Sequence, residues 1–240
     1  MFPLKDNIPT ERTPVVTIAL ILANVLVYFL LQRGGWEITQ DNTGDWPVGE
    51  YAAVPCDLTD QCTLPASHIP GVASVFTAMF MHGGLLHLGG NMLFLWIFGN
   101  NVEDSMGRVK YLLFYLAGGV AAFALQTLFD TDSAVPTLGA SGAVAAVLGG
   151  YILLYPRARV VTAIFIIIFF TVIELPALVV LGLWFVQQLL FGVAEFGTAG
   201  TGEGGVAYFA HIGGFVFGPP TRPDWPGWPL LPPSASLAPP

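Results

Sequence analysis

Charge is what this sequence lacks most. Only 10 % of its 240 residues are charged and 54 % are hydrophobic, with a formal net charge of -8 and a mean hydropathy of +0.68. A soluble domain of this size could not bury so much apolar surface, so we expect a polytopic membrane protein built as one bundle. The few basic residues form no footprint of the kind that binds nucleic acid, which excludes that class of partner.

Motifs for metal and nucleotide chemistry are also missing. The chain contains no His-Glu-x-x-His and no Gly-x4-Gly-Lys-Ser/Thr, so we expect no metal and no cofactor. There are only two cysteines, Cys56 and Cys62, and their C-x5-C spacing is a weak metal signature. Both a disulfide in an oxidising compartment and a pair of free thiols are compatible with the sequence.

Long apolar runs are what the sequence does have, and they predict an all-α bundle of six transmembrane helices. The stretch 160–172 is too short and too close to the next run to count as a separate span. The organisation expected is an N-terminal segment 1–13, a membrane domain 14–218 and a Pro-rich, extended or disordered tail 219–240. The predicted spans are 14–32, 85–99 with its lead-in 72–84, 109–129, 135–155, 173–192 and 206–218, with a long outer loop at 33–74.

The distribution of Lys and Arg predicts the orientation of the bundle. A cytoplasmic N-terminus leaves only Arg33 outside, in agreement with the positive-inside rule. No small-residue cleavage pattern follows the first span, so we expect it to be retained in a multi-pass protein of a bacterial plasma membrane. The basic residues on the inner side are then Lys5, Arg12, Arg108, Lys110, Arg157, Arg159 and Arg222.

Five polar residues fall at similar depth in this topology. His82, His87 and Asn91 lie at the outer entry to the second span, Ser141 at the entry to the fourth and His211 at the entry to the sixth. Burying unpaired polar groups in a membrane is costly, which favours a functional layer. Small residues along the fourth and sixth spans would let the serine hydroxyl and the imidazole meet at about 3 Å.

His87 and Asn91 are four residues apart and would share one helix face. There they can donate hydrogen bonds to an oxygen that gains negative charge, or else join helices by bonding backbone carbonyls. His82 would point about 140° away from that face, which favours a role in bracing the outer loop.

The order and spacing of these motifs resemble the rhomboid family of intramembrane serine proteases over about 72–218. The resemblance implies a six-helix bundle with an outward-facing site, Ser141 as nucleophile and His211 as general base. It also implies His87 and Asn91 as oxyanion donors, and substrates that are transmembrane segments of proteins within the lipid bilayer. The matching motifs are 76–82, His87-x3-Asn91, Glu103-Asp104-x2-Gly107-Arg108, Gly139-Ala140-Ser141-Gly142 and Ala210-His211-Ile212-Gly213-Gly214, with His82, Gly139, Ala140 and Gly142 as supporting residues.

The sequence departs from the family in three places. Ala145 stands where many relatives have an aromatic residue beneath the catalytic imidazole, and the outer loop has no Trp-Arg pair. The sixth span, at 206–218, reaches only about 20 Å of a core of about 30 Å, which predicts reduced stability or activity. Near the fifth span, Glu174 is expected to have an interfacial or helix-start role rather than a catalytic one, with Pro176 in the first helical turn.

Two other functions remain open. A protein with this fold but impaired catalysis could bind membrane clients without cutting them. A transporter could use His82, His87 and His211 as a proton relay, although no acidic residue lies at the predicted midplane. The sequence makes no prediction of the oligomeric state.

Overall fold

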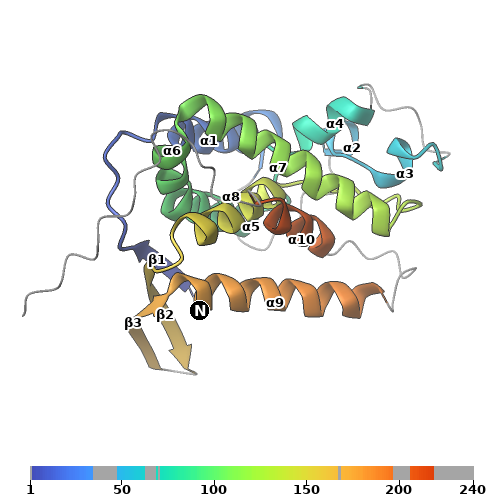
Figure 1. The fold of residues 1–240 in the computed structure, drawn as a ribbon. Coiled ribbons are helices and arrows are strands. Elements are labelled where there is room, and N and C mark those ends of the chain that lie inside the picture. Colours follow the sequence, from blue (N-terminus) through green and yellow to red (C-terminus); the bar gives the residue numbers. More distant parts are fainter. Residues whose placement is uncertain are drawn as a thin grey trace, which may run out of the picture.

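The computed structural model of the chain describes residues 2–34, 48–62, 69, 71–166, 169–196 and 206–218, and Figure 1 shows their arrangement. The predicted tail 219–240 lies outside these residues, as do His68 and most of the outer loop that the sequence places at 33–74. Helices make up most of the described chain, and a small sheet closes one end of the bundle.

The helices follow the apolar runs. They are α1 (Val15–Leu26), continued by the π-helical turn η1 (Val27–Leu31), then α2 (Val48–Tyr51), α3 (Pro55–Leu58), α4 (Gly71–Ala78), α5 (Leu85–Phe94), continued by η2 (Leu95–Gly99) and α6 (Asn100–Met106), then α7 (Arg108–Phe129), α8 (Ser141–Leu154), α9 (Ala177–Phe196) and α10 (Tyr208–Phe217).

These helices differ in whether they are long enough to cross a bilayer. Within the described chain, α7 and the part Ala177–Ala194 of α9 are long and apolar enough to cross a bilayer alone. The apolar segments Val15–Leu31, α8 and α10 are shorter, so the six-span count stays a prediction. Several predicted boundaries are wrong: the second helical run continues to Met106 rather than ending at 99, the fourth begins at Ser141 rather than at 135, and the fifth covers Ala177–Phe196 rather than 173–192.

The prediction of an all-α chain is wrong at one end of the bundle. The strands β1 (Phe2–Asp6), β2 (Arg159–Ile166) and β3 (Phe169–Pro176) form an antiparallel sheet in the order β1-β2-β3. The stretch 160–172, which is not a span in our prediction, supplies most of the β2–β3 hairpin. Its β-branched and aromatic residues suit a pleated strand better than a helix.

The sheet also changes the position of Glu174. This residue lies on β3, and its carboxylate is 3.6 Å from the guanidinium of Arg159 on β2. Pro176 is the last residue of β3 rather than part of a helical turn. The predicted helix-start role of Glu174 is therefore wrong, because the helix begins one residue after Pro176.

Two buried carboxylates organise the end of the bundle where the sheet lies. Glu103 accepts hydrogen bonds from the backbone N–H groups of Val16 (2.9 Å) and Thr17 (2.7 Å) and from the Thr17 hydroxyl (2.8 Å). The two N–H groups lie at the start of α1, where a helix offers them no partner of its own. No side chain of α1 caps them, so Glu103 takes that role. Gly107 then ends α6 at φ +78, a conformation that favours glycine, and α7 follows.

Asp6 ties the sheet to the helices. Its Oδ2 accepts hydrogen bonds from Asn101 Nδ2 (2.6 Å) and from the Tyr151 hydroxyl (2.7 Å). Burial raises the pKa of the Asp6 carboxyl above its usual range, although the bond from Tyr151 opposes that shift. β1, α6 and α8 are thereby joined at one buried acid.

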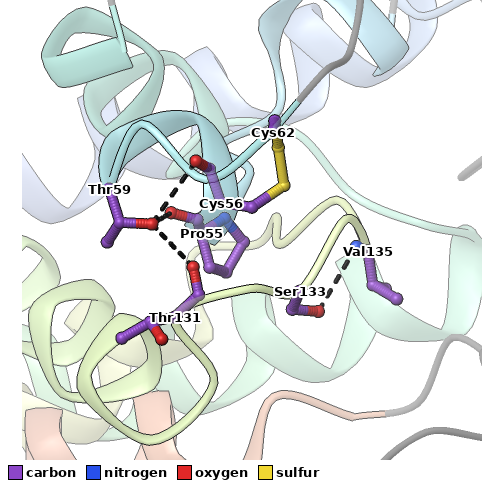
Figure 2. The surroundings of a disulfide bond; sticks show 7 residues. All are labelled: Pro55, Cys56, Thr59, Cys62, Thr131, Ser133 and Val135. Atoms are coloured by element: carbon purple, nitrogen blue, oxygen red, sulfur yellow. Dashed lines mark hydrogen bonds between the residues drawn. A yellow bond between two sulfur atoms is a disulfide. The ribbon is translucent and has the colours of Figure 1, made fainter.

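At the opposite end, a disulfide links Cys56 and Cys62, which settles the two alternatives left open by the sequence (Figure 2). The short segment that carries it is bound to the loop between α7 and α8. The Cys56 N–H donates to Ser133 O (3.0 Å), and the Thr59 hydroxyl donates to Thr131 O (2.6 Å). This part of the outer loop therefore braces the chain that leads to Ser141.

Small residues bring α8 and α10 into backbone contact. A methyl group added at Gly214 would overlap the carbonyl oxygen of Gly142, and one added at Gly149 would overlap the carbonyl oxygen of Phe215. Such close approach is how helices associate in lipid, where dispersion has to replace the hydrophobic effect. The expected tight packing of the fourth and sixth apolar segments is confirmed.

Candidate active site

Ser141 is the first residue of α8 and is partly buried. The chain reaches it through Gly139, whose φ of +125 is a conformation that favours glycine and whose N–H donates to Ala78 O (2.9 Å). A Cβ atom at Gly139 would lie 2.9 Å from His87 Nε2 and 3.5 Å from Ser141 Oγ. The glycine therefore lets the His87 ring and the Ser141 hydroxyl share one small space, with the free N–H groups of the α8 N-terminus beside them.

Asn91 lies one turn after His87 on α5 and is buried. Its Nδ2 has no hydrogen-bond partner among the described residues. A buried donor without a partner costs free energy, and a substrate oxygen that accepts its hydrogen bond would remove that cost.

His82 is fully buried, and its ring lies 5.1 Å from the His87 ring between centroids. The predicted angle of about 140° between His82 and the His87 face is wrong, because α5 begins only at Leu85 and helical geometry does not apply before it. Its backbone is nevertheless a brace: its N–H donates to Gln32 Oε1 (2.9 Å) and its carbonyl accepts from Gln32 Nε2 (3.0 Å). Both ring nitrogens lack a partner in the described part of the chain.

His211 lies on α10, and its Nδ1 is 2.8 Å from Oε1 of Gln188 on α9. The Trp184 ring, one turn earlier on α9, lies 5.7 Å from the imidazole. Among the described residues, no hydrogen bond joins His211 to Ser141. An aromatic side chain at 145 has no room, since a Cβ at Gly214 would already lie 3.1 Å from that of Ala145. Trp184 supplies the aromatic neighbour from a different helix.

Although α10 has only ten residues, it is packed against α7 on one side and α9 on the other. The Phe209 ring stacks on Phe129 of α7 at 4.3 Å, and the Phe215 ring stacks on Phe185 of α9 at 4.4 Å. The N–H of Ala210 donates to Gln126 Oε1 at 3.1 Å. His211 is thus positioned by contacts on both sides rather than by helix length.

A small cavity of about 30 Å³ lies beside the serine, lined by residues of α4, α7, α8 and α10, such as Ser141 and Ala210, and by Gly139 in the loop before α8. This is room for a water molecule or two. No group of three or more His, Cys, Asp or Glu side chains with metal-binding geometry occurs in the described residues.

The family model of the Rhomboid domain matches residues 70–220, a stretch that includes Ser141 and His211. The chain belongs to the rhomboid family. This rhomboid is accordingly an integral membrane protein, and the resemblance seen in its motifs is confirmed.

Curated relatives of this rhomboid come from mitochondria and from bacteria. Presenilin-associated rhomboid-like protein A of Danio rerio is 31% identical over 157 residues, which are 64% of this chain and 37% of the relative. Rhomboid protein 1 of Saccharomyces cerevisiae, also mitochondrial, is 29% identical over 65% of this chain and 42% of its own length. Rhomboid protease GluP of Bacillus subtilis is 31% identical over 57% of this chain and 24% of its own length. This rhomboid therefore spans less than half the length of each.

Sequence reasoning missed Gln188 and Trp184 as neighbours of His211. A signal for Gln188 was present, because Gln187 and Gln188 are the only hydrogen-bonding polar side chains besides the Trp184 indole between 177 and 194. A polar side chain in an apolar membrane helix needs a hydrogen-bond partner. The sequence does not say which helix faces α9, so that partner could not be named.

Proposed function

We propose that this rhomboid is an intramembrane serine endopeptidase that cleaves transmembrane segments of membrane proteins with Ser141 and His211. The family membership supports this proposal, and one relative is named a rhomboid protease. The observation that carries it is the contact between Gly142 and Gly214, which holds the helix of Ser141 against the helix of His211.

In the proposed reaction the Ser141 hydroxyl attacks the scissile carbonyl carbon while its proton passes to His211 Nε2. Asn91 Nδ2, the His87 ring and the Ser141 N–H would hold the oxyanion that forms. The imidazolium then gives its proton to the leaving amine, and the peptide bond breaks. Water, deprotonated by His211, hydrolyses the acyl-enzyme and frees Ser141.

A second candidate function is that of a client-binding protein that does not cut. It is favoured by the absence of a hydrogen bond between His211 and Ser141 in the described chain. Catalytic hydrogen bonds often tighten only when substrate binds, so the geometry is compatible with either function.

The orientation and compartment belong to this proposal as well. We infer an active site that faces the oxidising side of the membrane, because the Cys56–Cys62 disulfide braces the loop before Ser141. The relatives do not support a bacterial plasma membrane over a mitochondrial one, since two of the three named are mitochondrial.

The test compares the wild type with Ser141→Ala and His211→Ala in liposomes that contain a single-span substrate. We expect cleavage by the wild type and a loss of about 10³-fold or more in each variant. Ser105→Ala, at the sheet end of the bundle, is the control. Cleavage that survives Ser141→Ala would overturn the mechanism, and substrate capture without cleavage by the wild type would favour the binding function.

A further inference from the structure

The β2–β3 hairpin exposes an apolar surface at one end of the bundle. From 160 to 173 the chain has 14 residues without a charge. Phe169 and Phe170 near the turn are 74% and 69% exposed, and Val172 and Ile173 are also exposed. Consecutive residues of a strand point to opposite faces, so both faces of the hairpin are uncovered near its turn.

The base of the hairpin, in contrast, is fixed to the bundle. Val160 and Thr162 are fully buried, and the Ala177 N–H donates to Ala158 O (2.8 Å) where the hairpin meets α9. Figure 1 shows that the hairpin leaves this junction across the axis of α9 rather than along it. A hairpin held in that way extends sideways from the end of the bundle.

Three features favour a lipid surface as the partner that covers the hairpin. The apolar surface continues onto α9, where Leu178 and Val179 are exposed, and in an integral membrane protein such a helix face meets lipid. Exposed Lys5 and Arg157 lie on or next to the strands, where anionic headgroups would attract them. The edge strand β3 has backbone groups with no neighbouring strand in the described sheet, and these groups need headgroups or water rather than hydrocarbon.

We propose that the β2–β3 hairpin is a lipid anchor that lies in the boundary between headgroups and acyl chains at this end of the bundle. Phe169 and Phe170 enter the acyl region, and Lys5 and Arg157 face anionic headgroups. The anchor holds the sheet flat against one leaflet and fixes the depth of α9 in the membrane.

The test uses the full chain with its disulfide intact and an environment-sensitive fluorophore on a new cysteine at Phe170→Cys or Phe169→Cys. Glu11→Cys, an exposed position near the same end, is the matched control. In liposomes with brominated acyl chains we expect several-fold stronger quenching at 169 or 170 than at 11. Anionic lipid should strengthen it, and Lys5→Gln with Arg157→Gln should remove that effect.

Equal quenching at the hairpin and at position 11 would overturn the anchor. So would fluorophore self-quenching that rises with the protein-to-lipid ratio while bromine has no effect, because that outcome assigns the surface to a second copy of the chain. The measurement does not depend on protease activity.

The contact between Gln188 and His211 carries a second inference, which rests on the proposed function. Gln188 is buried, and its Nε2 donates to the Trp184 carbonyl (3.4 Å), which leaves Oε1 facing His211 Nδ1 at 2.8 Å. An amide oxygen only accepts hydrogen bonds, so Nδ1 has to carry the proton. The imidazole then has its lone pair on Nε2, the nitrogen that can take the serine proton.

The geometry points to Gln188 as a positioning residue that selects this tautomer. Gln188→Leu, of similar volume, should lower kcat about 10- to 100-fold and leave KM unchanged. Gln188→Glu should move the acid limb of the kcat–pH profile to higher pH, because a carboxylate stabilises the imidazolium. Gln187→Leu, the exposed neighbour, is the control. If the wild type cleaves but both Gln188 variants have the same kcat and pH profile, the role of Gln188 is wrong. A wild type that neither cleaves nor reacts with a fluorophosphonate at Ser141 overturns the proposed function itself.

Discussion

Two buried carboxylates at the sheet end of the bundle are hydrogen-bonded, whereas two buried polar side chains at the serine end have atoms without a partner in the described chain. At the sheet end, Glu103 accepts three hydrogen bonds and Asp6 accepts two through one oxygen. At the serine end, Asn91 Nδ2 and both ring nitrogens of His82 have no partner in the described chain. Satisfied groups stabilise a fold, whereas unsatisfied donors cost free energy until a ligand arrives. We therefore expect mutations at the first end to change stability and mutations at the second to change catalysis.

A substitution at the contact between the two helices of the proposed dyad should reduce both stability and catalysis. Gly214→Ala places a methyl group on the Gly142 carbonyl, and neither backbone can move far. We expect a loss of about 3 kcal/mol or more in the free energy of unfolding, with no cleavage. Gly182→Ala is the control, since its Cβ would meet nothing within 4 Å. Equal stability of the two variants would show that the helices are not locked together.

Asn91→Ala should separate catalysis from stability. Loss of an oxyanion donor typically costs about 10²- to 10³-fold in kcat, while removal of an unpaired buried donor leaves the free energy of unfolding unchanged or slightly higher. The control is Asn24→Ala, because Asn24 Nδ2 does donate to Leu20 O (2.7 Å). That variant should lose stability and keep its kcat, and the reverse pattern would contradict the comparison.

Glu103→Ala should show the opposite result to Asn91→Ala. It removes three hydrogen bonds from the start of α1, so we expect a loss of about 2–4 kcal/mol in the free energy of unfolding. The kcat of the folded fraction should not change. Denaturant titration and cleavage by the same preparation measure both, and Asp104→Ala, which loses one exposed hydrogen bond from the Glu11 N–H, should cost less than Glu103→Ala.

The disulfide should have a smaller effect on stability. Replacement of Cys56 and Cys62 by serine opens a short loop, which costs about 2 kcal/mol by the chain-entropy estimate. Because this segment braces the loop before Ser141, we expect a few-fold loss of activity as well. Reductant should reproduce the loss in the wild type and have no effect on the double variant; an equal response of both proteins would exclude the disulfide as the cause.

Asp6→Asn should change stability least. Because burial raises the pKa of Asp6, the contribution of this carboxyl to stability is fully present below the unfolded-state value of about 3.9 and is lost as pH rises through the folded-state pKa. Asn keeps the acceptor oxygen but carries no charge, so this variant should equal or exceed the wild type by less than about 1 kcal/mol at neutral pH. Unfolding measured across this pH range tests it, with Asp132→Asn on the exposed loop as control.

Sequence patterns predicted the helices well because apolar runs of this length have few alternatives in a membrane protein. The first, third and sixth runs match α1 with η1, α7 and α10 within two residues at each end. The 160–176 region was harder, since hydropathy does not separate a short helix from a hairpin and only the density of β-branched residues favours strands.

Part of the candidate site likewise follows from sequence motifs, and part depends on how the helices pack. The motifs predict Ser141, His87 and Asn91 as site residues, and the structure brings Ser141 and His87 together around Gly139. Gln188 could not be assigned, because its contact with His211 depends on how α9 packs against α10. The predicted direction of His82 is wrong because α5 begins only at Leu85, and the residues before it do not follow helical angles.

The hairpin also determines the direction of everything that follows it. By returning through β3 to Ala177, the chain begins α9 at the same end of the bundle where α8 finished. Had 160–172 crossed the membrane as one more helix, α9 and α10 would be inverted. His211 would then lie at the end of the bundle away from Ser141. The proposed pairing of Ser141 with His211 thus requires α9 to begin at the end of the bundle away from the serine, and the β2–β3 hairpin provides that start.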